Sequence, residues 1–363
     1  MKVLALNSSP RGGGQSKTEI MLKSLVQGMV EAGAEVEIVD LRKKKVKNCA
    51  GCFSCWTKTP GTCIHKDDMT QELFPKWLES DLVVYASPLY HFTVNAEMKT
   101  FIERTLPVLE PFFLQHNGRT YHPLREKPPK IVLLSVAGLP DEKVFDPLSY
   151  WVNYIYGGSH LEDKVLVAEL YRPMAEALTT PYFKDIAADI LGATRQAGRE
   201  IITSGKVSND TIARVKKPMV ENTDAFLELG NLMWKTCIAE GITPREFGEK
   251  GVMPRPDSIS SYIELMKLGF NPGPAGGLKT TIQFNFSGEH QGSCFLSIAD
   301  GSINGRQGSF NQPDLTVNTP FDVWMDILTG KADGQQMFLD QEYTVEGDLA
   351  LLMRMDQLFG RNS

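Results

Sequence analysis

Four of the six cysteines of this 363-residue chain lie in the stretch CAGCFSCWTKTPGTC at 49–63. Cys49, Cys52, Cys55 and Cys63 follow a C-x2-C-x2-C-x7-C spacing. Closely spaced thiolates on one loop can converge on a [4Fe-4S] cluster or on tetrahedral zinc with little loss of chain entropy. They can also remain free or redox-active thiols, or pack as small apolar side chains. The spacing favours a metal or redox site and leaves its occupant open.

The stretch NSSPRGGGQSKT at 7–18 has the residue types of an anion site. It follows an apolar run and precedes a helical pattern, so unpaired backbone N–H groups and the positive end of a helix dipole meet there. Ser9, Ser16 and Thr18 add hydroxyls, Arg11 adds a guanidinium, and three successive glycines let the backbone bend closely. The stretch lacks the Gly-Lys-Ser/Thr ending of a triphosphate loop and is not G-x-G-x-x-G. A monophosphate is the expected ligand, and an ordinary capped turn is the alternative.

A third stretch, SPLYHFTVNAEMKTFIERT at 87–105, follows another apolar run. Its aromatic cluster can form the wall against which a flat ring lies, or it can pack in the core. His91 is a candidate proton donor, with a packing role as the alternative.

The elements that must position these residues alternate between strands and helices. Apolar runs predict strands at 2–6, 35–40, 81–87, 130–136 and 164–170. One helical pattern begins at Ser16 and is ended by Gly33, and a second begins at Ala96. This alternation predicts an α/β fold with a doubly wound parallel sheet, which binds ligands at the carboxyl ends of its strands.

The rest of the chain has a different pattern. Residues 206–256 predict a polar helical connector, and 257–363 predict an α+β domain with strands of period two and helices near 320–330 and 347–359. The first domain is therefore expected at 1–205. Cys237 and Cys294 are isolated and are expected to be buried as small apolar side chains.

Residues 1–200 resemble the NAD(P)H-dependent FMN reductases and iron-sulfur flavoproteins, which are flavodoxin-like enzymes, through NSSPRGGGQS and SPLYHFTVNAEMKTFIER. The resemblance implies FMN as cofactor, NAD(P)H as co-substrate, and a homodimer or tetramer that covers the flavin. The FMN ligands that it implies are Ser9, Arg11, Ser16, Lys17 and Thr18 for the phosphate and Pro88, Leu89, Tyr90, His91, Phe92, Val136, Ala137 and Gly138 for the ring. The sequence departs from the family at Ser8, where glycine is common, and at 136–139, which has fewer glycines and hydroxyls.

The cysteine stretch, together with Asp67-Asp68-Met69, resembles the motif of iron-sulfur flavoproteins, whose cluster lies beside the FMN. Related reductases carry similar cysteine stretches without an obvious need for a cluster. The resemblance therefore implies Cys49, Cys52, Cys55 and Cys63 as metal ligands and keeps free thiols as an alternative.

Residues 257–363 resemble the sterol carrier protein 2 domain, through an ordered set that includes Asp300-Gly301, Pro313-Asp314 and Val345-Glu346-Gly347-Asp348. The resemblance implies an apolar tunnel for an acyl chain or sterol. Its candidate lining residues, for which ordinary core packing is the alternative, are Phe284, Phe286, Trp324, Leu328, Met337, Phe338, Met353 and Met355.

Composition narrows the function classes. A net charge of −6 argues against binding nucleic acid. The basic run at 42–47 is a local exception. It can attract a phosphorylated dinucleotide or an acidic redox partner, or it can be a solvated loop. Neither a signal peptide nor a membrane span is expected, which predicts a cytoplasmic protein. The leading hypothesis is an FMN-dependent NAD(P)H oxidoreductase that reduces a small-molecule acceptor. A lipid carrier with a redundant flavin domain and a ferredoxin-linked electron-transfer protein are the alternatives.

Overall fold

The computed structural model describes residues 1–116, 118–158, 164–180, 183–220 and 222–359. The chain forms two compact units, Met1–Met219 and Val220–Ser363, each with its own core. Residues 206–219 belong to the first unit, and residues 222–256 to the second. The three-part division expected from the sequence stays a prediction.

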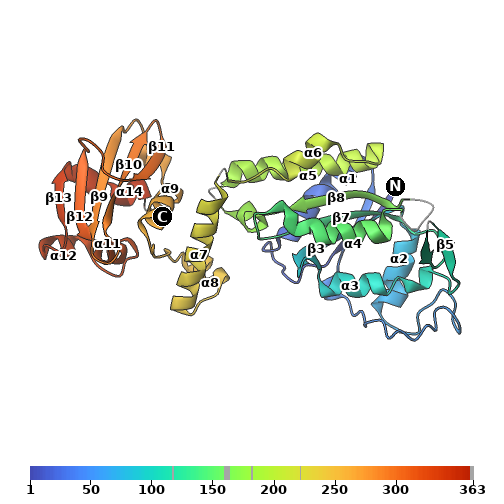
Figure 1. Ribbon diagram of the computed structural model, residues 1–363. Helices are drawn as coiled ribbons and strands as arrows, with labels where there is room; N and C mark the ends of the chain where they lie inside the picture. Colours follow the sequence, from blue (N-terminus) through green and yellow to red (C-terminus); the bar gives the residue numbers. More distant parts are fainter. Residues whose placement is uncertain (117, 159–163, 181–182, 221, 360–363) are drawn as a thin grey trace. The chain divides into compact units, whose positions relative to one another are not determined.

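The first unit is built on a twisted parallel sheet (Figure 1). Its parallel strands are β1 (Lys2–Asn7), β2 (Glu35–Asp40), β3 (Leu82–Tyr90), β7 (Lys130–Val136) and β8 (Leu166–Arg172). They lie in the order β2-β1-β3-β7-β8, with the short β4 (Thr93–Val94) paired to β3. This is the flavodoxin-like order, so the predicted doubly wound fold is confirmed. The order reverses between β1 and β3, where such sheets bind ligands.

Helices cover both faces of this sheet (Figure 1). The helices of the first unit are α1 (Lys17–Glu31), α2 (Phe74–Glu79), α3 (Ala96–Glu103), α4 (Asp146–Tyr156), α5 (Lys184–Ser204) and α6 (Asn209–Val215). α1 packs against α5 with their backbones in direct contact. A Cβ atom at Gly28 would lie 1.8 Å from the carbonyl oxygen of Arg195, and one at Gly198 would lie 2.1 Å from that of Leu25. Only glycine fits at these two positions.

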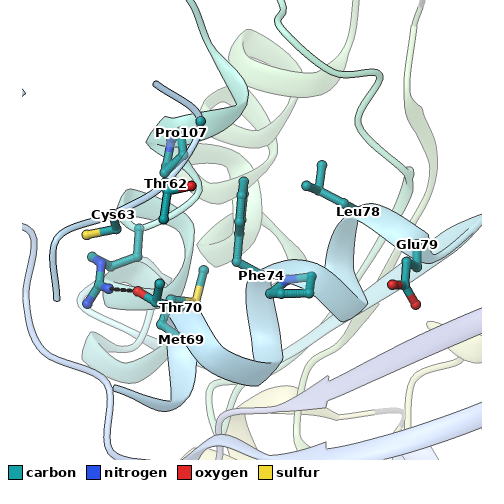
Figure 2. Close-up of a pocket in the computed structure, with 11 residues that line it drawn as sticks. Thr62, Cys63, Met69, Thr70, Phe74, Leu78, Glu79 and Pro107 are labelled. Carbon is teal, nitrogen blue, oxygen red and sulfur yellow. Dashed lines mark hydrogen bonds between the residues drawn. The ribbon is translucent and has the colours of Figure 1, made fainter. Parts of the chain in front are cut away.

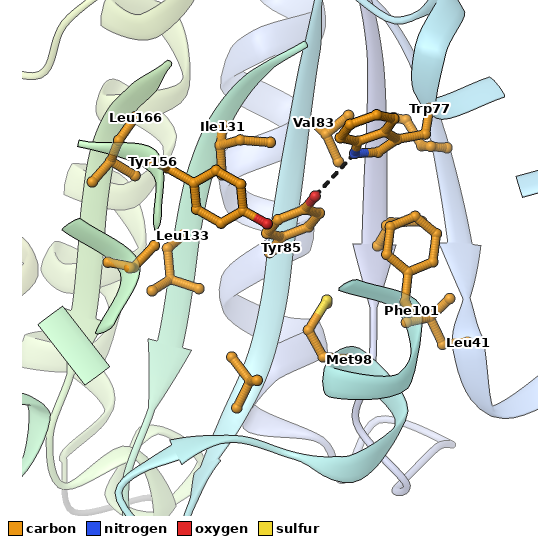
Figure 3. Close-up of a cluster of buried hydrophobic side chains, with 14 of the residues drawn as sticks. Leu41, Trp77, Val83, Tyr85, Met98, Phe101, Ile131, Leu133, Tyr156 and Leu166 are labelled. Atoms are coloured by element: carbon orange, nitrogen blue, oxygen red, sulfur yellow. Dashed lines mark hydrogen bonds between the residues drawn. The ribbon is translucent and has the colours of Figure 1, made fainter. Parts of the chain in front are cut away.

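The opposite face holds a core that α2, α3 and α4 share with alternate residues of the strands. Figure 3 shows Trp77, Tyr85 and Tyr156 at its centre. The indole N–H of Trp77 donates to the hydroxyl of Tyr85 at 2.9 Å, and burial raises the pKa of Tyr156 to about 12. These phenols are neutral and structural, and they support the strands that carry the site.

Short elements complete the first unit. They are the hairpin β5 (Leu114–His116) and β6 (Arg119–Tyr121), the 3-10 turns η1 (Leu41–Lys43), η3 (Leu106–Val108), η4 (Glu142–Phe145) and η5 (Ala175–Thr179), and the π-helical turn η2 (Met69–Leu73).

The second unit places helices against a five-stranded sheet in the order β11-β10-β9-β12-β13. Its pairs are antiparallel except β9 with β12, which is parallel. The strands are β9 (Thr280–Ser287), β10 (Gly292–Ala299), β11 (Ser302–Gln307), β12 (Leu315–Pro320) and β13 (Thr344–Gly347), and the helices are α7 (Thr223–Glu240), α8 (Pro244–Lys250), α9 (Ile259–Leu268), α10 (Pro272–Ala275), α11 (Phe321–Leu328), α12 (Gly334–Leu339), α13 (Leu349–Met353) and α14 (Met355–Phe359).

The α+β character predicted for the C-terminal part is confirmed, with one correction. The helix expected at 347–359 is two short helices, because α13 ends at Met353 and Arg354 caps it before α14 begins. No helix in the described ranges is long and apolar enough to cross a bilayer.

Candidate flavin and cysteine sites

The phosphate loop, residues 8–16, joins β1 to α1 and is held in shape by its own hydrogen bonds. The Ser9 hydroxyl accepts from the backbone N–H of Arg11 at 3.3 Å, and Ser16 caps α1 by accepting from Glu19 N–H at 3.0 Å. Gly13 and Gly14 have φ values of 65° and 79°, which favour glycine. Ser9, Ser16 and Thr18 are buried. The loop is a preformed cradle at the N-terminus of a four-turn helix, where an anion binds well.

Two cations, Arg11 of this loop and Lys17 at the start of α1, face an acidic residue that sequence analysis did not select. Arg11 lies 2.8 Å and Lys17 3.2 Å from the carboxylate of Glu176, which belongs to η5 after β8. Arg42 donates to the carbonyl of Arg11 at 2.7 Å and to Asp40 at 3.1 Å. The contacts that Glu176 and Arg42 make with Arg11 span 165 and 31 positions, so the sequence shows only the charges of these residues.

The candidate ring loop is a tight hairpin between β3 and β4. Tyr90 pairs with Thr93, so His91 and Phe92 form a two-residue turn. Both have left-handed backbone, with φ values of 46° and 60°. Such a turn is of type I′ and normally uses Asn-Gly, so two bulky residues there hold strain. Tyr90, His91 and Phe92 are exposed rather than packed in the core.

A buried hydrogen-bond network joins the ring loop to the phosphate loop. The side chain of Asn95 donates to the carbonyl of Ser8 at 2.6 Å, and its backbone N–H donates to the Ser87 hydroxyl at 3.0 Å. Asn95 also caps α3 by accepting from Met98 N–H. The Ser8 hydroxyl donates to Ala86 O at 3.1 Å. Asn95 was missed from the sequence, although an Asn before a helical run is a capping signal.

The remaining ring candidates lie at the neighbouring strand ends. Pro88 is buried and pairs in register with Val136 at the end of β7. Val136 and Ala137 are buried, whereas Leu89 is partly exposed and Gly138 is exposed. The proposed phosphate and ring contacts therefore come from adjacent strand ends β1, β3 and β7.

The cysteine segment, residues 47–67, follows β2 and η1. Cys49, Cys52, Cys55 and Cys63 all line one small pocket. Burial and the nearby charges of the other three raise the pKa of the Cys55 thiol, while a hydrogen bond from Ser54 lowers that of Cys52. This all-thiol donor set around a common pocket fits an iron-sulfur cluster or zinc. Within the described residues, no three His, Cys, Asp or Glu side chains are already gathered as around a bound ion.

A buried ion pair closes the base of the cysteine segment. The Arg104 guanidinium donates to both carboxylate oxygens of Asp67, at 2.8 and 3.1 Å, and the two side chains are 1% and 4% exposed. Burial raises the pKa of Asp67, but hydrogen bonds from Arg104, Lys47 and Thr70 outweigh it and hold the pKa far below its usual value. Neither residue was singled out for this role, because their pairing spans 37 positions.

A cavity of ≈ 360 Å³ lies behind Cys63 (Figure 2). Cys63, Thr62 and Pro107 lie at one end, Leu78 and Glu79 lie at the other, and Phe74 is between them. Met69 and Thr70 of the π-helical turn η2 also line it. The cysteine segment thus borders this cavity through residues 61–63.

The candidate tunnel residues of the second unit divide into two groups. Phe284, Phe286 and Trp324 are buried in one aromatic cluster, in which the Trp324 indole donates to the Tyr262 hydroxyl at 3.1 Å. Leu328, Met337 and Met355 pack partly buried against the same cluster. Phe338 and Met353 are 41% and 68% exposed.

Comparison with known proteins finds a matching family for each of two parts of the sequence. Residues 1–141 match the family described as NADPH-dependent FMN reductase, and residues 272–360 match the SCP-2 sterol transfer family. An iron-sulfur flavoprotein of Archaeoglobus fulgidus is 42% identical over 107 residues, which are 30% of this chain and 46% of that protein. An FMN-dependent NADH:quinone oxidoreductase of Pseudomonas aeruginosa is 27% identical over 145 residues, 38% of this chain and 70% of that protein.

Among solved structures, an azoreductase from Bacillus anthracis is 17% identical with a TM-score of 0.40, over 55% of this chain and 98% of that one. The chain spans about half the length of the curated iron-sulfur flavoproteins that it matches. The resemblances expected from the sequence are confirmed: one part of the chain, at 1–141, is similar to the NADPH-dependent FMN reductase family, and another part, at 272–360, is similar to the SCP-2 sterol transfer family.

Proposed function

We propose that the first unit is an FMN-dependent NAD(P)H oxidoreductase. One observation carries this proposal: the hydrogen bond from Asn95 to Ser8 joins a preformed anion cradle to an exposed, strained aromatic hairpin. A phosphate at one end and a flat ring at the other is the shape of FMN. The family match over 1–141 supports the same assignment.

Bound FMN would supply the redox chemistry by accepting a hydride from NAD(P)H. The chain's residues bind and orient it. Ser9, Ser16 and Thr18 with the N-terminus of α1 would hold the phosphate, and Arg11 and Lys17 would exchange Glu176 for it. The hairpin would hold one edge of the ring, with Val136, Ala137 and Gly138 beside it. Hydride transfer requires no acid or base from the protein. His91, which lies in the turn, would be the candidate proton donor.

We further propose that the four cysteines hold a [4Fe-4S] cluster. The pocket that the four cysteines share supports iron-sulfur or zinc over free thiols. The name of the Archaeoglobus fulgidus relative favours iron. The cluster would pass electrons from the flavin to a small-molecule acceptor, and a subunit partner would cover the exposed ring loop.

The SCP2 segment suggests an apolar ligand for the second unit. Six of the eight proposed tunnel residues meet at one aromatic cluster, which an acyl chain or sterol would have to open. Displacement of a fluorescent fatty acid from the full chain tests this role, with Trp324→Ala expected to weaken binding. If the wild-type chain does not bind the probe, a lipid-carrier function fails.

Anaerobic reduction tests the main proposal. The purified protein should carry FMN, and NADH or NADPH should bleach its visible band. If the protein neither contains nor takes up FMN, the proposal fails. Iron, sulfide and zinc analysis of the same sample separates the three possible states of the cysteines. A Cys55→Ala variant should lose metal and keep FMN, and unchanged metal content would contradict the ligand set.

A ferredoxin-linked role is the second candidate, favoured by one observation. Lys43, Lys45 and Lys47 are exposed on the chain leading to Cys49, which suits docking of an acidic redox protein. If NAD(P)H fails to bleach the flavin but reduced ferredoxin reduces it, the ferredoxin role replaces the first. Substituting the three lysines by glutamine should then slow reduction by ferredoxin, more at low than at high salt.

A further inference from the structure

Arg104 holds the two ends of the cysteine segment together. It caps the C-terminus of α3, and its guanidinium is buried. One nitrogen, Nη1, donates to the carbonyl of Lys47 at 2.6 Å and to Asp67 at 2.8 Å, so it bridges the first and last residues of the segment. The other, Nη2, donates to Asp67 and to the Thr70 hydroxyl, both at 3.1 Å. The position and orientation of the guanidinium are therefore fixed.

The third nitrogen, Nε, is buried and has no hydrogen bond of good geometry to any described residue. An arginine buried this completely normally uses all its donors. Cys63 borders the same pocket and lies close to the guanidinium. The buried side chain that carries the unused donor and a candidate ligand sulfur therefore border the same pocket.

We propose that Nε of Arg104 donates a hydrogen bond to the Cys63 thiolate when the four-cysteine centre is loaded, and so sets the reduction potential of its cluster. This inference rests on the iron-sulfur part of the proposed function. Arg104 is a positioning residue: it acts on the cluster through Cys63 and does not bind iron.

The physical reason is charge. Four thiolates give an iron-sulfur cluster a net negative charge, and each added electron increases it. A fixed cation and a hydrogen bond to one sulfur stabilise the reduced state, so they raise the potential. Asp67 moderates the positive charge but fixes the plane of the guanidinium. Lysine can supply charge, but it cannot make the two-oxygen contact with Asp67 and point a separate N–H at the sulfur.

The test compares Arg104→Lys with wild type, both as full chains reconstituted anaerobically with iron and sulfide. Iron, sulfide and FMN contents are measured first, and the cluster potential is then followed by electron paramagnetic resonance. We expect FMN content to stay unchanged and the potential to become more negative, with at least a tenfold change in the one-electron reduction equilibrium, which is about 59 mV. An unchanged potential with a fully loaded cluster overturns the proposal.

Thr70→Val is the matched control. It removes a hydrogen bond to Nη2 and leaves Nε and Cys63 intact. If Arg104 only braces the segment, both variants should lower cluster content in the same way and leave the potential of the loaded fraction unchanged. If Arg104→Lys does not hold a cluster at all, an Arg104→Gln variant, which keeps an N–H donor without charge, is measured instead. A potential equal to that of wild type in this variant overturns the charge argument.

Failure of the broader proposal gives a different result. If the wild-type chain takes up no cluster under reconstitution, the role of Arg104 is overturned, whereas FMN binding and bleaching by NAD(P)H still support the oxidoreductase. If FMN is absent but a cluster forms, the comparison of potentials still decides the role of Arg104.

Discussion

Two loops at the carboxyl edge of the same sheet use charge in opposite ways. The phosphate loop has its cations near the surface, where Arg11 is 55% exposed and meets an exposed carboxylate, Glu176. The cysteine segment has its ion pair, Arg104 and Asp67, almost completely buried. An exposed pair contributes little to stability and separates easily, whereas a buried pair is costly to break.

The difference indicates what each loop is ready to do. The phosphate loop keeps its backbone shape through Ser9, Ser16 and its glycines, so its cations are free to exchange Glu176 for a ligand phosphate. The cysteine segment has backbone turns of its own between residues 53 and 62. Its ends are joined by the backbone N–H of Lys47, which donates to Asp67 at 2.9 Å, and by the buried Arg104, which donates to both ends. One loop is shaped for exchange, and the other is fixed around its thiols.

Asp67→Asn should give the largest effect, because it leaves the Arg104 guanidinium buried without a counter-charge. We expect a loss of about 3–5 kcal/mol in the free energy of unfolding of the first unit. A urea titration followed by FMN release at fixed FMN concentration measures it. The neighbouring Asp68→Asn, whose carboxylate accepts a backbone bond from Lys45, is the control and should lose about 1 kcal/mol. Equal losses in the two variants would show that the buried pair has no special weight.

The same pair predicts a dependence on pH. Since Arg104 and two backbone N–H groups lower the pKa of Asp67 in the folded chain, its contribution is present above the ordinary carboxyl pKa of about 3.9. It is lost as the pH falls below that value toward the folded-state pKa. The stability gap between wild type and Asp67→Asn should therefore be constant from pH 7 to about pH 5 and shrink below about pH 4. A gap that grows on acidification would reverse the sign of this argument.

Arg11→Gln tests the exchangeable side of the comparison. On the proposed function, the variant would lose one charge-assisted hydrogen bond to the FMN phosphate, at a side chain that is 55% exposed. We expect FMN affinity to fall about tenfold, near 1.4 kcal/mol, with stability unchanged. Fluorescence titration with FMN and with riboflavin, which lacks the phosphate, distinguishes the causes. A similar loss for riboflavin would place Arg11 at the ring instead of the phosphate.

Phe92→Gly separates strain from binding in the hairpin. Glycine accepts the left-handed turn that Phe92 adopts at a φ of 60°. Relief of this strain, less the entropy that glycine loses on folding, should stabilise the ligand-free chain by about 0.5–1 kcal/mol. FMN should bind more weakly, because an exposed aromatic wall is lost. A variant that gains stability and keeps full FMN affinity would remove Phe92 from the proposed ring contacts.

The fold of the first unit, and the strand ends at which its candidate site residues lie, were predictable because both depend on local pattern. Apolar runs with the length of buried strands predicted β1, β2, β3, β7 and β8. Short sequence motifs then indicated which of the loops after these strands could bind a ligand. The aromatic run at 90–92 was correctly expected at a strand end, but its left-handed turn was not, since no Asn-Gly signal marks it.

What sequence reasoning missed are the residues that connect loops. Glu176 meets Arg11 across 165 positions, and Asn95 meets Ser8 across 87. Such pairs have no periodicity, so only the folded sheet brings them together. In the second unit, residue types also failed to separate buried from exposed methionines: Met355 packs on the core, whereas Met353, two residues earlier, is exposed.

Glu176→Gln should give the smallest effect and the opposite sign to Arg11→Gln. In the ligand-free chain, Glu176 neutralises Arg11 and Lys17, so FMN must displace it to reach them. Removing its charge removes this competition. Because exposed ion pairs contribute about 0.2–1 kcal/mol, FMN should bind about 1.4- to fivefold more tightly at low salt, and less of this gain should remain as ionic strength rises. Weaker FMN binding in this variant would mean that Glu176 orients the two cations instead of competing for them, and the phosphate loop would then resemble the cysteine segment in depending on a fixed pair.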